Sequence, residues 1–224
     1  MKRIRDLIVL LLLVGLLVAS WFMHGVRRVE TDSLVVALTF DDGPNPPYTD
    51  ALLSVLADKK VTATFFLIGQ EVEAHPETAR QITKAGHELG GHSYGWESLA
   101  LKRRKQVEQQ LDQMCQAFLD AGIPKLVLFR PPSGILVPGQ AQLLQERGLT
   151  HISADVVVGD WKLENAEAIR ERVVKKVRPG SIIVLHDGGG NRGATVKATP
   201  MIIDDLRSNG YSFVSVSELL RTAP

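Results

Sequence analysis

Apolar runs of strand length alternate with helical patterns along most of the chain. Runs rich in Val, Ile, Leu and Phe predict buried strands, whereas apolar residues at every third or fourth position predict amphipathic helices. The predicted strands are residues 34–40, 62–67, 87–92, 126–130, 150–154, 182–186 and 212–216. The predicted helices are residues 48–60, 76–86, 103–122, 139–148, 165–177 and 199–210. Strands that alternate with helices pair in parallel. The pattern therefore predicts an α/β fold with about seven parallel strands, as an open doubly wound sheet or as a barrel with fewer units than usual.

Residues 1–30 have a different character and form a separate predicted unit. Three basic residues precede an apolar run without charges at 7–23, which just reaches the length needed to span a bilayer as one helix. The basic N-terminus favours a topology with residues 31–224 outside the cytoplasm. Two fates stay open: a single-pass membrane anchor, or a secretory signal that is cleaved after the small residues at 18–20. Residues 31–224 are predicted to form one globular domain.

Charge and cysteine content exclude some classes of protein. Without residues 1–30 the chain has 21 Lys and Arg residues against 23 Asp and Glu residues. A nearly neutral domain does not favour nucleic acid as a partner. Cys115 is the single cysteine of the chain, so a disulfide within one chain is excluded. It lies in a helical pattern and is interpreted as a core residue.

Polar side chains suited to catalysis stand at the carboxyl ends of several predicted strands. In a parallel α/β fold these ends converge on one face, where ligand and catalytic sites are built. The residues concerned are Asp41 and Asp42 after the first strand, His92 after the third, Arg130 after the fourth, Asp160 and Trp161 after the fifth, and His186 and Asp187 after the sixth.

The adjacent pair Asp41 and Asp42 indicates a specific chemistry. Two neighbouring carboxylates at the end of a buried strand repel each other unless a metal ion or a guanidinium lies nearby. One of the pair can then bind the cation while the other works as a base.

Five segments carry a resemblance to a known family: TFDDGPN, GHELGGHSYGW, FRPPSG, GDW and IVLHDGGG. In order and spacing they resemble the motifs of the polysaccharide deacetylases, the NodB-like group also called carbohydrate esterase family 4. The resemblance extends over about residues 33–221. It implies a distorted (β/α) barrel of seven strands, here preceded by one apolar helix. It also implies a divalent metal, usually zinc or cobalt, and removal of acetyl groups from N- or O-acetylated glycans such as peptidoglycan or chitin-like polymers.

The resemblance also implies a role for individual residues. Amide hydrolysis needs an activated water, a Lewis acid at the carbonyl oxygen and an acid for the leaving nitrogen. By position in the motifs, the catalytic residues are Asp41 as base, Arg130 orienting that base, His186 as acid and Asp160 paired with His186. The metal ligands are Asp42 and His92, with Ser93 steadying the loop, and the residues predicted to bind substrate are Ser133, Trp161 and Leu185.

One position departs from the family pattern. The motif H-[ST]-x-x-H has a second metal-binding histidine where this chain has Trp96. A catalytic zinc normally keeps three protein ligands, and the motifs here supply only two. Glu97 is the first candidate for a substitute, and His75 and His87 are alternatives. Three functions stay open: a deacetylase with a substitute ligand or a weak metal site, an impaired relative that binds glycan, and an amide hydrolase for a non-sugar substrate. Because base, acid and both orienting partners are present, we favour the enzyme.

Overall fold

The structure, a computed structural model, describes residues 25–123 and 125–223. The apolar run at 7–23, predicted as a membrane helix or signal, therefore lies outside the described residues. Within the described part of the chain, none of the helices combines the length and the hydropathy needed to cross a bilayer.

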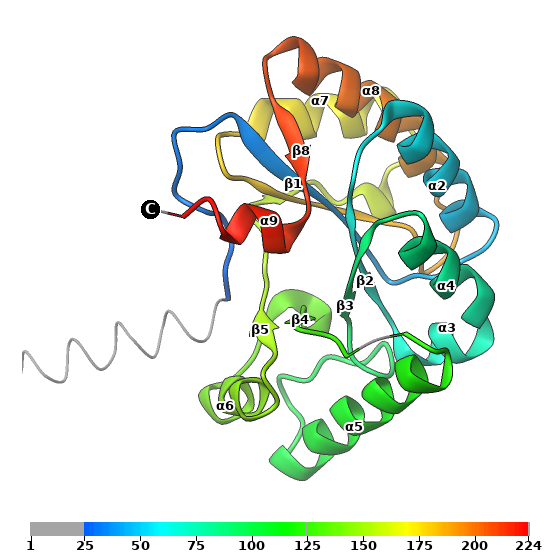
Figure 1. The fold of residues 1–224 in the computed structure, drawn as a ribbon, viewed down its shortest axis with the longest axis vertical. Helices are drawn as coiled ribbons and strands as arrows, with labels where there is room; N and C mark the ends of the chain where they lie inside the picture. The colour runs from blue at the N-terminus through cyan, green and yellow to red at the C-terminus, as the bar shows by residue number, and fades with distance from the viewer. Residues whose placement is uncertain (1–24, 124, 224) are drawn as a thin grey trace, which may run out of the picture.

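The described strands form one curved sheet in which every strand pair is parallel (Figure 1). Seven strands follow the order β5-β4-β3-β2-β1-β7-β6, and β8 pairs with β1 off this path. This confirms the predicted α/β fold, a distorted and incomplete barrel with about seven parallel strands. The strands are β1 (Val35–Asp41), β2 (Thr64–Leu67), β3 (Glu88–Gly91), β4 (Leu128–Phe129), β5 (Thr150–His151), β6 (Val156–Val157), β7 (Ile182–His186) and β8 (Ser212–Val214).

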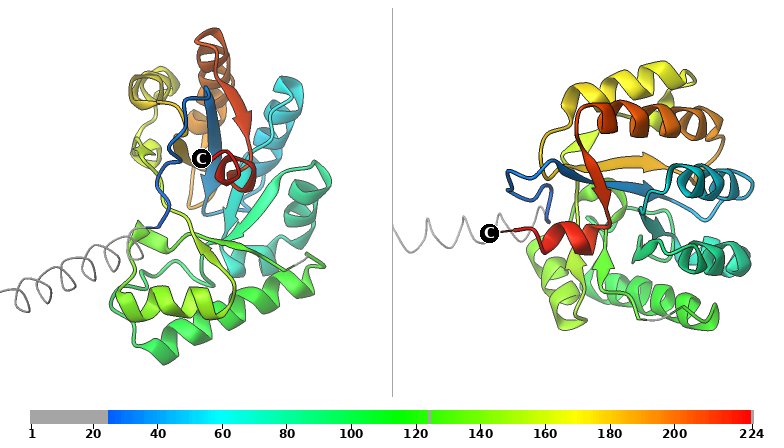
Figure 2. Two further views of the ribbon diagram at one scale, coloured as in Figure 1. Left: turned by 60° about the vertical axis from the view of Figure 1, so that its left-hand side comes forward. Right: turned by 45° about the horizontal axis from the view of Figure 1, so that its top comes forward.

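All described α-helices except the last cover the outer, convex side of this sheet (Figures 1 and 2). All six predicted helices are present, although the last begins at Gly193 instead of residue 199, and two short helices, α3 and α9, were not predicted. The helices are α2 (Tyr48–Lys59), α3 (Gly69–Ala74), α4 (Pro76–Lys84), α5 (Arg104–Asp120), α6 (Pro138–Glu146), α7 (Ala166–Lys176), α8 (Gly193–Ser208) and α9 (Val216–Leu220).

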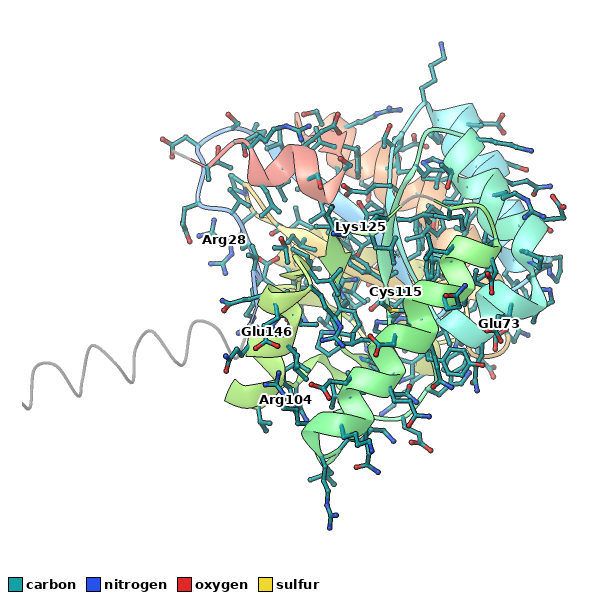
Figure 3. The ribbon with its side chains drawn as sticks, turned by 60° about the horizontal axis from the view of Figure 1, so that its bottom comes forward. Arg28, Glu73, Arg104, Cys115, Lys125 and Glu146 are labelled. Atoms are coloured by element: carbon teal, nitrogen blue, oxygen red, sulfur yellow. The ribbon has the colours of Figure 1, made fainter. Side chains whose placement is uncertain are left out.

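Helices α5 and α6 contact each other on one side of the barrel. Figure 3 shows Arg104 of α5 beside Glu146 of α6, and their side chains pair at 2.7 Å. Cys115 of α5 is partly buried against the core, and burial raises the pKa of its thiol. A thiol with a raised pKa is a poor nucleophile, which supports the interpretation of Cys115 as a packing residue.

Strand β1 shows how the sequence sorts side chains between the two faces of the sheet. Alternate residues of a strand point to opposite faces. Leu38 and Phe40 are fully buried in the cluster between sheet and helices, whereas Ala37 belongs to the second cluster, inside the curve of the sheet. Thr39 and Asp41 follow the parity of Ala37. The same alternation that builds the core therefore directs Asp41 to the concave side.

Helix α9 closes the inner core at the amino-terminal ends of the strands. Val216 and Leu219 pack in the same cluster as Phe66 and Ile182. The backbone N–H of Val216 donates to the Thr64 hydroxyl at 3.0 Å, at the start of β2. The opposite ends of the strands, where the polar residues gather, remain open for a site.

The predicted strand at 150–154 is wrong as a single strand. Its first residues form β5, and the chain then crosses to β6 at the other edge of the strand order. Hydrogen bonds with distant residues hold this crossing: the Ser153 carbonyl accepts from Arg130 at 3.1 Å, and Asp155 accepts from the backbone of Ile182 at 3.0 Å. Val26 forms a bridge with Ile152 in this segment, and Arg28 forms a bridge with Ser181, just before β7.

Candidate active site

Asp41 is held by a buried arginine. It ends β1 and is 4% exposed, and Arg130, which directly follows β4, donates to its Oδ1 at 2.5 Å. The same guanidinium donates to the Thr39 hydroxyl at 2.8 Å and lies 4.0 Å from the centroid of the Phe66 ring. Burial lowers the pKa of Arg130 while Asp41 opposes that shift, and an arginine stays charged in a protein in any case. The pair keeps one carboxylate oxygen fixed at the mouth of the barrel.

His186 ends β7 and lies directly beside Asp41 in the strand register. Its ring Nδ1 is 2.9 Å from Asp160 Oδ1, and its backbone N–H donates to Asp160 Oδ2 at 2.9 Å. Burial alone would lower the pKa of His186, but Asp160 and the carboxylates of Asp41 and Asp42 outweigh it, so the net shift is upward. His186 therefore keeps its proton to a higher pH than a free imidazole and can act as an acid.

Thr195 completes the support of Asp160 and was missed by the sequence analysis. Its hydroxyl donates to Asp160 Oδ2 at 2.8 Å from the first turn of α8. No motif marks this residue, since the contact joins positions 35 residues apart. With both oxygens occupied, Asp160 holds the imidazole of His186 in one orientation.

Asp42 and His92 place two possible metal ligands side by side. Asp42 Oδ1 lies 3.4 Å from His92 Nε2, and His92 Nδ1 is 2.8 Å from the Arg130 carbonyl oxygen. A carbonyl can only accept, so Nδ1 carries a proton and Nε2 is the nitrogen that faces Asp42. Burial works against ionisation of Asp42, but His92, His186 and Arg192 outweigh it and lower the pKa of Asp42. Asp42 is thus a carboxylate at neutral pH, as a metal ligand must be.

A cleft of about 440 Å³ collects these groups at the carboxyl ends of the strands. Besides Asp41, Asp42, His92, Arg130 and His186, its walls include Trp96, Ser133, Trp161 and Val184. Trp161 is 42% exposed and its ring meets His186 edge-on, 4.7 Å between centroids. The Ser133 hydroxyl lies 2.8 Å from the Ser98 hydroxyl, which joins two loops of the rim. Asp41, Asp42, His92, Ser133, Arg130, Trp161 and His186 therefore meet where the sequence predicted.

The prediction that Leu185 binds substrate is wrong. It is fully buried in the cluster between sheet and helices and does not line the cleft. On β7 the residue with the parity of His186 is Val184, which does line the cleft. The apolar wall assigned to Leu185 therefore belongs to its neighbour Val184.

Comparison with known proteins agrees with this geometry. The family model described as polysaccharide deacetylase matches residues 28–152, more than half of the chain. The chain belongs to the polysaccharide deacetylase family. The peptidoglycan-N-acetylglucosamine deacetylase of Bacillus cereus is 36% identical over 196 residues, which cover 87% of this chain and 92% of the relative. The chitooligosaccharide deacetylase of Sinorhizobium fredii is 34% identical over 88% of this chain and 97% of its own length. These relatives of the polysaccharide deacetylase family are hydrolases that act on amide bonds.

Solved structures similar to this chain include relatives named as enzymes and one described as a pseudoenzyme. A peptidoglycan N-acetylglucosamine deacetylase superposes with a TM-score of 0.85 at 28% identity, over 90% of this chain and 94% of the other. A family 4 acetyl xylan esterase from Clostridium thermocellum, solved with a cobalt ion, has a TM-score of 0.77 at 33% identity over 85% and 93%. A protein from Bacillus anthracis described as a pseudoenzyme has a TM-score of 0.82 at 27% identity over 88% and 69%.

In this member of the polysaccharide deacetylase family, Trp96 packs on the loop that follows His186. A Cβ atom built on Gly189 would lie 3.1 Å from the Trp96 ring and 3.1 Å from the Arg192 guanidinium. Gly189 has a φ of +75°, in the region that favours glycine. The indole, 43% exposed, thus forms part of the cleft wall and offers no metal-binding atom.

None of the three substitute ligands considered from the sequence reaches Asp42 and His92. The Glu97 side chain is 75% exposed and pairs with Lys102. His87 is buried, packs on Phe65 and accepts from the backbone of Ala63 at 3.3 Å, and His75 lies between α3 and α4. Among the described residues, no cluster of three or more His, Cys, Asp or Glu is arranged to hold a metal ion. The donor pair fits a divalent cation, with one protein ligand fewer than a catalytic zinc site normally has.

Asp187 is a buried carboxyl next to the site that the sequence analysis left without a role. It is fully buried, and Thr49 donates to its Oδ2 at 2.6 Å. Its Oδ1 has no hydrogen-bond partner among the described residues. Burial raises the pKa of Asp187 to about 7, helped by the charges of Asp42 and Asp41 and opposed by the hydrogen bond from Thr49.

This pKa predicts a measurable pH dependence of stability. Between about pH 4 and pH 7 the native state keeps the Asp187 proton that the unfolded state has lost. The native state then binds one proton more than the unfolded state. The free energy of unfolding therefore falls by about 1.4 kcal/mol for each pH unit of increase in that interval. We expect Asp187→Asn, which mimics the neutral acid, to remove this decline in urea unfolding at pH 5 and pH 7.5. Asp204→Asn, at an exposed pair with Lys59, is the control and should keep it. Equal pH dependence in the parent and Asp187→Asn would contradict a protonated Asp187.

Proposed function

We propose that this chain removes acetyl groups from an N-acetylated, or O-acetylated, cell-envelope or environmental polysaccharide, with the help of a divalent metal ion. The observation that carries the proposal is the placement of Asp41 and His186 as direct neighbours on β1 and β7. Each is held by its own buried partner, Arg130 or Asp160. Relatives named for peptidoglycan and for chitooligosaccharides support a glycan that contains N-acetylglucosamine.

Asp41 acts as the base in the proposed reaction. Its carboxylate accepts a proton from the water that attacks the acetyl carbonyl carbon. The hydrogen bond from Arg130 fixes the orientation of the carboxylate. The cleft around it is walled by Trp161 and Val184, which suit the small apolar methyl of an acetyl group.

His186 acts as the acid. It gives a proton to the leaving nitrogen as the carbon–nitrogen bond breaks, and the products are acetate and a free amine. Asp160 maintains the protonated imidazole, and Thr195 holds Asp160. For an ester substrate the same proton goes to the leaving oxygen.

Asp42 and His92 are the residues that would hold the metal, zinc or cobalt. A bound divalent ion supplies a Lewis acid that polarises the carbonyl and lowers the pKa of water. With only two protein ligands in the described part of the chain, we expect metal affinity below that of a site with three.

The weak metal site favours a second candidate function, glycan binding without turnover. Trp96 stands where the family pattern has a metal-binding histidine, while the proposed base, the proposed acid and the two possible metal ligands line the cleft. The similarity to a protein described as a pseudoenzyme of the same family fits this alternative.

Acetate release separates the two functions. The purified protein is incubated with N-acetylchito-oligosaccharide and with peptidoglycan, before and after chelator treatment and with zinc or cobalt added back. The deacetylase predicts acetate release that the chelator abolishes and the metal restores. Binding of these glycans without acetate release under any divalent ion would establish the second function instead.

The location of the domain is a further part of the proposal. The basic N-terminus and the apolar run at 7–23 support a protein held at the cell membrane with residues 31–224 outside the cytoplasm, or the same domain secreted after cleavage of the signal. We expect a protease added to intact cells or spheroplasts to digest a membrane-held domain, as followed by immunoblotting. A cytoplasmic marker protein must survive the same treatment. Digestion of the domain only after lysis would refute this topology.

A further inference from the structure

A second hollow adjoins the catalytic cleft. Its volume is about 690 Å³, and Trp161 lines both hollows. It lies between the turn after β6 and the loop that leads into α8. The side chains and backbone that matter for its chemistry are Trp161, Lys162, Glu164, Gly189, Arg192 and Lys197.

The charge of this hollow is positive. Three cationic side chains, Lys162, Arg192 and Lys197, face one carboxylate, Glu164. Lys162 and Lys197 are both exposed, and neither forms an ion pair with another described residue. Cations that no protein carboxylate neutralises attract an anionic group of a ligand.

Arg192 gives the hollow a fixed, buried cation. It is 8% exposed and donates to the backbone carbonyls of Gly188 at 2.6 Å, Gly189 at 2.7 Å and Asn191 at 3.0 Å. These acceptors are neutral and orient the guanidinium, which also interacts electrostatically with Asp42 in the adjoining cleft. These bonds use three of the five N–H groups of the guanidinium, and Arg192 lines the hollow.

Trp161 lies between the two hollows and lines both of them. Its ring meets His186, the proposed acid, so it marks one edge of the reacting acetyl group. On its other side begins the cationic hollow. A sugar whose acetyl group lies at His186 would therefore extend its neighbouring sugar across Trp161 into this hollow.

We propose that the hollow is a subsite for an anionic group carried by the sugar next to the acetylated one. The preferred substrate is then an acidic glycan rather than a neutral one. The inference rests on the proposed function only in that the cleft holds an acetylated glycan. The test measures binding of oligosaccharides, so its result does not depend on whether the protein deacetylates them.

The test compares two oligosaccharides of equal length: a neutral N-acetylchito-oligosaccharide, and an oligosaccharide in which N-acetylglucosamine alternates with glucuronic acid. Tryptophan fluorescence reports binding, because Trp96 and Trp161 both line the cleft. We expect the acidic oligosaccharide to bind at least about fivefold more tightly at low salt and to lose this advantage as salt screens the charges. In Lys162→Gln/Lys197→Gln the preference should fall to about twofold or less, while affinity for the neutral oligosaccharide stays the same.

The control variant, Lys105→Gln/Lys175→Gln, removes two exposed lysines elsewhere and should keep the preference. Equal affinities for the two oligosaccharides in the parent, or equal losses in both double variants, would overturn the subsite. Binding of inorganic phosphate together with equal affinities for the two oligosaccharides would point instead to a site for small free anions.

Discussion

Asp41→Asn and His186→Ala each lower the rate of acetate release by at least about 100-fold, if the two residues are the base and the acid of the reaction. Loss of a general acid or base typically costs 10²–10⁴-fold. Asn keeps the shape of Asp41 and can still accept from Arg130, but it cannot take a proton from water at neutral pH. Removal of the His186 ring takes away the proton donor and leaves Asp160 Oδ1 without the imidazole that it contacts.

Turnover numbers at saturating substrate check this prediction, with thermal unfolding measured for each variant to show that the fold is kept. Leu185→Val is a suitable control, because Leu185 lies next to His186 on β7 but points into the outer core. It should cost stability rather than turnover. Activity of Asp41→Asn or His186→Ala within a few-fold of the parent would remove that residue from the mechanism.

Trp96→His is expected to raise metal affinity by at least about tenfold. The change returns an imidazole to the position where the family pattern has its second metal-binding histidine. Changes at residues that only support metal ligands alter affinity by about 10–100-fold, and a direct ligand should matter at least as much. If metal limits turnover in the parent, acetate release at low zinc rises with it. Because Trp96 packs on Gly189, the smaller ring also leaves space in the cleft wall, so affinity is measured on protein shown to be folded.

Glu97→Ala is the matched control for this experiment. The structure pairs Glu97 with Lys102 at the surface, which predicts unchanged zinc affinity in both the parent and the Trp96→His background. Loss of metal from Glu97→Ala alone would show that Glu97 turns inward to bind it. If Trp96→His gains neither metal affinity nor activity, the segment from His92 to Trp96 is not a metal site that lacks one ligand.

The sequence predicted the positions of the cleft residues better than it predicted the sheet, whereas their catalytic roles stay predictions. Asp41, His92, Arg130 and His186 are placed by the ends of short strands, and such local patterns are visible in one sequence. The interior position of Val184 could have been predicted as well, since it lies two residues before His186 and therefore on the same face. Leu185 was predicted to bind substrate from the family motif alone, although strand alternation places it on the face opposite to His186.

Two predicted elements differ from the structure. The split of residues 150–154 into β5 and the crossing to β6 depends on contacts with Arg130 and Ile182, which are distant in sequence. The predicted helix at 199–210 begins later than α8, which starts at Gly193. In the structure Pro200 lies inside α8, where it cannot donate a backbone hydrogen bond, and the preceding turns begin at Gly193.

The β-bridge at Val26 determines how far the catalytic domain could reach from a membrane. If the apolar run at 7–23 serves as an anchor, only two residues separate it from a position already bound to the barrel wall at Ile152. Extended chain spans about 3.3–3.6 Å per residue, so the slack amounts to roughly 10 Å. A domain of this size is roughly 40 Å across. An anchored form would thus modify only polysaccharide strands within about 50 Å of the bilayer. Signal cleavage would free the same cleft to work at any depth of the envelope, so retention or removal of the leader would decide which layer of polymer is deacetylated.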